Sequence, residues 1–142
     1  CFLTLEITET ARISDHEVAA TILNELRSIG VRISMDDFGV GAANYEAFYE
    51  LPFDEIKIDR MFVANIAKDP KARAIVASIA AMGRGARITV VAEGLENPQD
   101  IPLLQEAGCQ QVQGFAFSRP LSLSNLLEYQ ELAPEQTLSN IV

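Results

Sequence analysis

The feature that most constrains the fold of this chain is a repeat. Short apolar, β-branched runs each carry acidic or lysine residues at or near their ends. The residues concerned are Glu6, Asp36, Asp37, Lys57, Asp59 and Glu93. If the runs are parallel strands, these side chains project from one edge of the sheet. Because clustered carboxylates repel one another, we expect a divalent cation to compensate them there.

The apolar runs alternate with segments of helical periodicity, which predicts right-handed β-α-β units and a parallel sheet. The predicted strands are Phe2–Ile7, Val31–Met35, Glu55–Asp59, Arg87–Ala92 and Gln111–Phe117. The predicted helices cover about 15–29, 44–50, 70–82, 98–107 and 123–132. The tail after Pro134 is polar and is expected to be loosely held.

Several helix ends carry recognisable signals. Ser14 and Glu17 have the spacing of a capping box, and Gly30 is expected to end that helix. Asp69-Pro70 and Asn97-Pro98 both place a capping residue before a proline at the first helical position. The segment Gly83-Arg-Gly85 is expected to end the helix predicted over about 70–82.

Two α/β architectures fit this order of elements. An open doubly wound sheet places its ligand at a single switch point, whereas a (β/α)8 barrel builds its site from the carboxyl ends of many strands. Polar residues decorate successive strand ends here. The sequence therefore favours the C-terminal portion of a (β/α)8 TIM-type barrel, about five β-α units long.

Net charge and cysteine content argue against several classes of binding partner and site. A net charge of −9 argues against binding to DNA or to an anionic membrane surface. It leaves open a nucleotide substrate, because a bound metal inverts the local field. The two cysteines, Cys1 and Cys109, are too few for a disulfide framework or a zinc site, and are typical of reduced thiols in the cytoplasm.

Five segments together resemble the EAL-domain family, phosphodiesterases that linearise the bacterial second messenger cyclic di-GMP. They are Leu5-Glu-Ile-Thr-Glu-Thr10, Asp36-Asp-Phe-Gly-Val-Gly41, Leu51-Pro-Phe-Asp-Glu-Ile-Lys-Ile-Asp-Arg60, Val90-Val-Ala-Glu-Gly-Leu-Glu96 and Gly108-Cys-Gln-Gln-Val-Gln-Gly-Phe-Ala-Phe-Ser-Arg-Pro120. They occur in the family's order and span nearly the whole chain.

The resemblance implies a catalytic centre with two Mg²⁺ or Mn²⁺ ions in the complete domain. The metal ligands it implies are Glu6, Asp36, Asp37 and Glu93. It implies that Lys57 lies beside the attacking water and the phosphate, that Glu93 is a ligand or a general base, and that Gln113 holds water or substrate. By the same resemblance Glu9 braces the loop that carries the paired aspartates. Arg119 is a candidate substrate contact, and a structural role for it stays open.

The chain departs from the family pattern in two ways. The Glu-Ala-Leu segment and an asparagine ligand are expected N-terminal to Cys1, so residues 1–142 are interpreted as the C-terminal part of a single EAL domain. That part alone is expected to be inactive. Val40 also replaces a small hydroxyl residue, and Phe115 replaces a common tyrosine, each with the loss of a possible hydrogen bond.

Two functions of different class remain. The first is metal-dependent hydrolysis of cyclic di-GMP. The second is an inactive module that binds cyclic di-GMP or a protein partner as a receptor. The resemblance also implies a homodimer, for which Tyr45, Phe48 and Tyr49 are candidate contacts, and an upstream sensor or GGDEF-type domain. A barrel enzyme acting on an enol with a lysine base is a third, weaker hypothesis, because it leaves the Gln113 and Arg119 segments unexplained.

Overall fold

The computed structural model describes the chain except for residues 1–2, 10, 12, 42–44 and 133–142. Its strands are β1 (Thr4–Thr8), β2 (Arg32–Phe38), β3 (Glu55–Ile58), β4 (Thr89–Ala92) and β5 (Gln111–Val112). Its helices are α1 (His16–Ser28), α2 (Tyr45–Glu50), α3 (Arg60–Val63), α4 (Pro70–Ala86), the 3₁₀ turn η1 (Pro98–Asp100), α5 (Ile101–Ala107) and α6 (Leu123–Leu132). The stretch expected to be loosely held after Pro134 lies outside the described residues.

The five strands form one parallel sheet in the order β1-β2-β3-β4-β5. A doubly wound sheet reverses its strand order at a switch point, whereas consecutive barrel strands pair with their sequence neighbours without a reversal. The observed order has no reversal, so it confirms the prediction of a partial barrel. The carboxyl ends of all five strands consequently lie along one edge.

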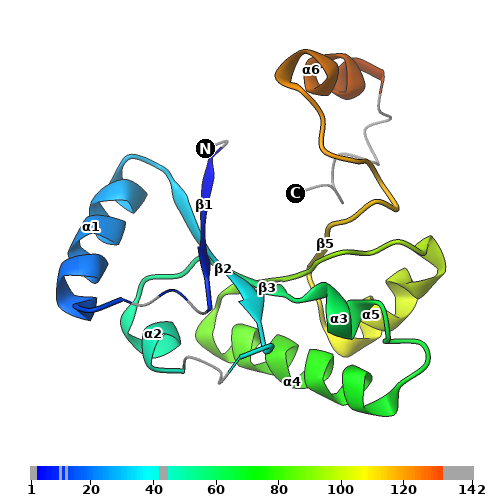
Figure 1. Cartoon of the computed structure of the whole chain (residues 1–142), viewed down its shortest axis with the longest axis horizontal. Coiled ribbons are helices and arrows are strands. Elements are labelled where there is room, and N and C mark those ends of the chain that lie inside the picture. Colours follow the sequence, from blue (N-terminus) through cyan, green and yellow to red (C-terminus); the bar gives the residue numbers. More distant parts are fainter. Residues whose placement is uncertain (1–2, 10, 12, 42–44, 133–142) are drawn as a thin grey trace.

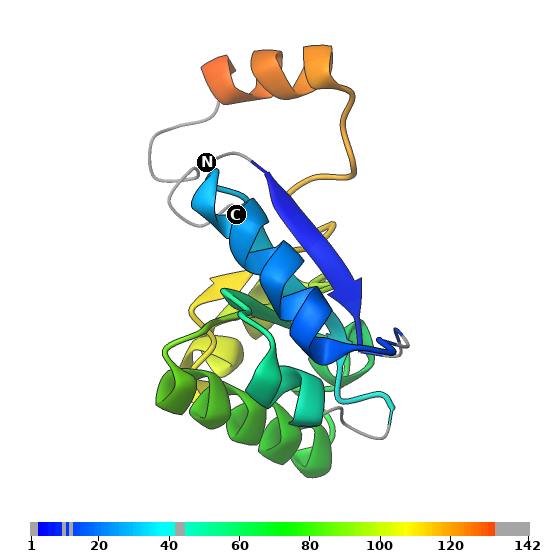
Figure 2. The same ribbon diagram turned by 90° about the vertical axis from the view of Figure 1, so that its left-hand side faces the viewer.

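The helices α1, α2, α4 and α5 cover the outer face of the curved sheet, while α6 stands apart from them (Figures 1 and 2). Beneath these helices lies one hydrophobic core, in which Ile33, Ile56 and Val90 from neighbouring strands are fully buried. Within the described residues, no helix is both long enough and apolar enough to cross a membrane.

An ion pair closes the side of the sheet away from the strand carboxyl ends. The guanidinium of Arg27 donates to both carboxylate oxygens of Asp54, at 2.7 to 3.2 Å, and the amide of Ile33 donates to Oδ2 at 3.0 Å. Burial alone would raise the pKa of Asp54, but these hydrogen bonds outweigh it and hold that pKa below its usual value. The pair ties the end of α1 to the sheet.

Two predicted helix ends are wrong, for identifiable reasons. The cap of α1 is Asp15, whose Oδ1 accepts a hydrogen bond of 3.0 Å from the amide of Val18, so the Ser14 capping box does not form. Helix α4 continues through both glycines to Ala86. A Cβ atom at residue 83 would lie 2.2 Å from a methyl group of Val90, so Gly83 serves close packing of α4 on β4 rather than helix termination.

Several predicted strand boundaries also differ, by one or two residues at most of these ends and by more at the ends of β2 and β5. Strand β2 extends three residues beyond Met35 to Phe38, through a register irregularity against β3. Strand β5 ends at Val112 rather than Phe117, because the chain turns at Gly114, whose carbonyl accepts the Phe117 amide at 3.1 Å. The short helix α3 was not predicted; it begins directly after β3, where Asp59 caps it.

Candidate metal and substrate site

A buried lysine occupies the centre of the site. The side chain of Lys57, on β3, is 3% exposed, and its Nζ lies 2.9 Å from Oε1 of Glu6 and 3.2 Å from Oε2 of Glu93. It also lies 3.3 Å from Oδ1 of Asp36, within ion-pair range, although that buried oxygen accepts no hydrogen bond from the described residues. Strands β1, β2 and β3 and the residue after β4 thus each direct one charged group to a common point.

Three of the carboxylates converge more closely. Asp36, Asp37 and Glu93 each offer an oxygen, and these oxygens all lie within 4.8 Å of one another. Adjacent residues of a regular strand point to opposite faces. Here the irregularity of β2 between Met35 and Phe38, with Asp37 at a φ of 58°, brings both aspartates to the same site.

The charges of this group are unbalanced. Burial raises the pKa of Asp37, the carboxylates of Asp36 and Asp59 raise it further, and Lys57 lowers it by less. Burial also raises the pKa of Glu93; Lys57 lowers it, and Asp36 opposes that effect. One lysine therefore does not neutralise the acids, and hard oxygen donors in this arrangement fit Mg²⁺, Mn²⁺ or Ca²⁺.

The carboxylates around Lys57 hold its amino group in the charged form. Burial alone would lower the pKa of Lys57, but the hydrogen bond to Glu6 and the charges of Glu93 and Asp36 outweigh it and raise that pKa above its usual value. Lys57 is accordingly a fixed positive charge at neutral pH, not a proton donor or acceptor.

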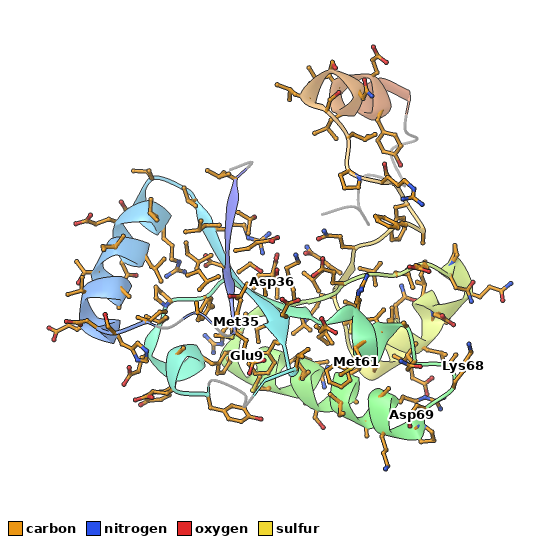
Figure 3. All side chains as sticks on the ribbon, in the orientation of Figure 1. Glu9, Met35, Asp36, Met61, Lys68 and Asp69 are labelled. Carbon is orange, nitrogen blue, oxygen red and sulfur yellow. The ribbon has the colours of Figure 1, made fainter. Side chains whose placement is uncertain are left out.

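The structure places Glu6 and Glu9 at different depths. Glu6 pairs with Lys57 at the site, outside the group of three converging carboxylates. Glu9 is 5% exposed, and its Oε2 accepts the amide of Gly39 at 2.9 Å and that of Gly41 at 3.3 Å. The side chain therefore lies under the loop that follows the paired aspartates (Figure 3). Residues 42–44, which continue that loop, lie outside the described residues.

A cavity of about 440 Å³ adjoins the carboxylates at the ends of β4 and β5. Glu93 and Gln113 line it, and so does Arg119, whose guanidinium lies 4.6 Å from the centre of the Phe115 ring. The sequence interpretation did not single out Arg60, which begins α3 and lines the same cavity. Its position directly after Asp59 at a strand end was the available signal.

Asp59 has a mixed role. Its Oδ1 accepts the amide of Met61 at 2.7 Å and caps α3. Its carboxylate also lies close enough to Asp37 to raise the pKa of that residue by charge and by hydrogen bonding. Asp59 therefore has a structural role, the cap of α3, next to the candidate metal ligands.

The comparisons with known proteins agree with this geometry. The EAL domain family model matches residues 1–120. The chain belongs to the EAL-domain family. Cyclic di-GMP phosphodiesterase NbdA of Pseudomonas aeruginosa is 41% identical over 129 residues, which are 91% of this chain and 16% of NbdA.

Two solved structures are similar to the chain throughout most of its length. The phosphodiesterase MucR of P. aeruginosa, solved as a complex with cyclic di-GMP, superposes with a TM-score of 0.76 at 40% identity, covering 87% of this chain and 50% of that one. Klebsiella pneumoniae BlrP1, solved with manganese and cyclic di-GMP, gives a TM-score of 0.73 at 37% identity, covering 82% and 30%. The chain thus spans half or less of these relatives.

Proposed function

We propose that residues 1–142 form the C-terminal part of a single EAL domain that hydrolyses cyclic di-GMP to the linear dinucleotide. The observation that carries the proposal is the convergence of Asp36, Asp37 and Glu93 around Lys57 beside a cavity of about 440 Å³. The phosphodiesterase activity for which NbdA is named and the cyclic di-GMP bound to MucR and BlrP1 support it.

In this proposal Asp36, Asp37 and Glu93 are cation ligands. Glu6, which forms an ion pair with Lys57, is a further ligand. The cations are Mg²⁺ or Mn²⁺, and the complete domain holds two of them. The manganese in the BlrP1 structure supports a divalent cation of this class. Bound divalent cations polarise a phosphate and activate water for attack on phosphorus. No histidine, thiolate or other soft ligand stands among these three carboxylates.

The protein's own groups have separable roles in the proposal. Lys57, permanently charged, neutralises the phosphate oxygen that gains charge as the P–O bond breaks. Glu93, whose pKa is raised, is the group best placed to accept a proton from the attacking water. Gln113 and Arg119 face the cavity and orient the substrate, and Glu9 holds the loop after Asp37.

A turnover assay tests this directly. The protein that contains this segment is incubated with cyclic di-GMP and Mg²⁺ or Mn²⁺, and the linear product is measured by chromatography. We expect Asp36→Asn to abolish turnover while the fold remains intact. Binding of cyclic di-GMP without any turnover by the wild type would instead support the receptor alternative, which the convergence of Asp36, Asp37 and Glu93 disfavours.

We also propose a homodimer through the surface near the loop after Asp37. Tyr45 and Tyr49 on α2 are 62% and 88% exposed, which supports an interface there, whereas Phe48 is half-buried against Phe38. Light scattering that gives a monomer at high protein concentration would contradict this. We further propose that this domain is fused to a sensor or GGDEF-type domain, by analogy with MucR, which is named as a bifunctional cyclase and phosphodiesterase. We also propose a cytoplasmic location, which the free, buried thiol of Cys109 supports.

A further inference from the structure

The segment that follows β4 is held by backbone hydrogen bonds on both sides. The amide of Glu93 donates to the carbonyl of Ile58 at 3.1 Å, which joins it to the end of β3. The amide of Leu95 donates to the carbonyl of Gln113 at 3.0 Å, and the Leu95 carbonyl accepts the amide of Ala116 at 2.9 Å. Two loops that carry site residues are therefore tied together through one residue.

Leu95 and Gly114 approach each other more closely than any side chain permits. A Cβ atom at residue 114 would lie 2.2 Å from the carbonyl oxygen of Leu95 and 2.3 Å from its nitrogen. These are rigid backbone atoms, and the Leu95 side chain is anchored in the core at 1% exposed. A methyl group at residue 114 therefore has no flexible neighbour to displace, and the two loops must separate.

We propose that Leu95 and Gly114 form a backbone clamp that positions Glu93 and Gln113 for metal and substrate. The proposal rests on the proposed function, and both are positioning residues, because the Leu95 side chain is buried in the core and Gly114 has no side chain. Leu95 follows Glu93 by two residues, and Gly114 follows Gln113 directly. A displacement of this pair moves a ligand away from Asp36 and a polar group away from the cavity at the same time.

Small displacements matter at this site. The oxygens of Asp36, Asp37 and Glu93 lie within 4.8 Å of one another, and Glu93 lies 3.2 Å from Lys57, so a shift of about 1 Å breaks the arrangement. Loss of a group that orients a ligand typically weakens metal affinity about 10- to 100-fold. The clamp therefore makes a prediction about metal binding, separate from the stability of the fold.

The test compares three glycine-to-alanine variants of the protein that contains this segment. Gly114→Ala breaks the clamp, whereas Gly83→Ala creates an equally short contact of 2.2 Å in the core, with a side-chain methyl of Val90. Gly85→Ala adds a methyl group to open space on the exposed face of α4. Mn²⁺ affinity is measured by the loss of the free Mn²⁺ signal in electron paramagnetic resonance, and the melting temperature by circular dichroism.

We expect Gly114→Ala to weaken Mn²⁺ binding about 10- to 100-fold. Gly83→Ala is expected to lower the melting temperature with unchanged Mn²⁺ affinity, and Gly85→Ala to change neither property for the worse. Wild-type affinity in Gly114→Ala would overturn the clamp and leave the proposed function standing. No Mn²⁺ binding by the wild type would refute the metal site itself, and the clamp with it.

Hydrogen exchange tests the same inference without a variant, so that misfolding of Gly114→Ala cannot leave it undecided. Addition of Mg²⁺ is expected to slow exchange of the Leu95 and Ala116 amides, which make the clamp's hydrogen bonds. The amide of Arg73, bonded to the Asp69 carbonyl in α4, is the control and is expected not to respond. Bound Mg²⁺ with unchanged exchange at Leu95 and Ala116 would contradict the clamp.

Discussion

Replacement of Lys57 by methionine tests the electrostatics of the site. Methionine matches the length and apolar stem of lysine but removes its positive charge. The three carboxylates of Glu6, Asp36 and Glu93, which lie within 3.3 Å of Nζ, would then face one another without compensation. We therefore expect Lys57→Met to lower the free energy of unfolding of the metal-free chain at pH 7.

The magnitude follows from burial. Removal of one partner of a buried ion pair costs about 3–5 kcal/mol, and a single hydrogen bond to a charged group contributes about 1.5–3 kcal/mol. The Lys57 side chain is 3% exposed, but Glu6 is 47% exposed and water relieves part of its charge. We therefore expect a loss of about 2–4 kcal/mol, measured by urea denaturation.

Two conditions sharpen this test. Because the folded pKa of Lys57 is raised, its stabilising contribution is complete below its unfolded pKa of about 10.4 and is lost only as pH rises through the folded value. At pH 7 the deficit is thus fully expressed, and Mn²⁺ should reduce it by replacing the missing charge. Lys68→Met, at an exposed lysine far from Asp36 in Figure 3, is the control and should change stability by less than about 0.5 kcal/mol. Equal stability of Lys57→Met and the wild type at pH 7 would refute the reasoning.

Three further predictions concern the rest of the structure. Asp54→Asn should lower the free energy of unfolding by about 1–2 kcal/mol at pH 7 and should not change it at acid pH. The reason is that the folded pKa of Asp54 is depressed, so its contribution to stability is lost as pH falls through that value. A loss of stability that does not depend on pH in urea titrations would contradict this. Glu9→Ala should cost about 1–3 kcal/mol and raise the exchange rate of the Gly39 amide; unchanged exchange would count against the bracing role. In a Cys1→Ser background, Cys109, buried and with its pKa raised by burial to about 11, should react with a disulfide reagent only on unfolding, so rapid native reaction would be inconsistent with the fold.

Local signals predicted much of the fold. The starts of β3 and β5, the caps at Asp69 and Asn97 and the end of α5 at Gly108 all rest on neighbouring residues, and the structure reproduces them. The errors arise where a distant contact overrides a local preference. The sequence predicts a helix end at Gly83, but this residue packs closely against Val90 and lies inside α4.

The candidate site likewise combines features that local sequence signals predict with features that depend on distant contacts. Its acids could be predicted from strand ends and from the resemblance, because parallel strands bring such ends to one edge. The irregular backbone at Asp37, the common contact of Lys57 with three acids and the approach of Gly114 to Leu95 depend on pairing between segments far apart in the chain. No local pattern in one sequence encodes those distances, so the sequence indicated the acids and the lysine that meet at the site but not their geometry.

Acids from separate strands are proposed to hold a divalent cation jointly, and Mn²⁺ binding to the protein that contains this segment tests this most directly. Free Mn²⁺ is measured by electron paramagnetic resonance for the wild type, for Asp36→Asn, and for Asp100→Asn, a control whose side chain caps no helix. We expect the wild type and Asp100→Asn to bind Mn²⁺ alike, and Asp36→Asn to bind at least about 10-fold more weakly. Equal binding by all three, or none by the wild type, would contradict the account.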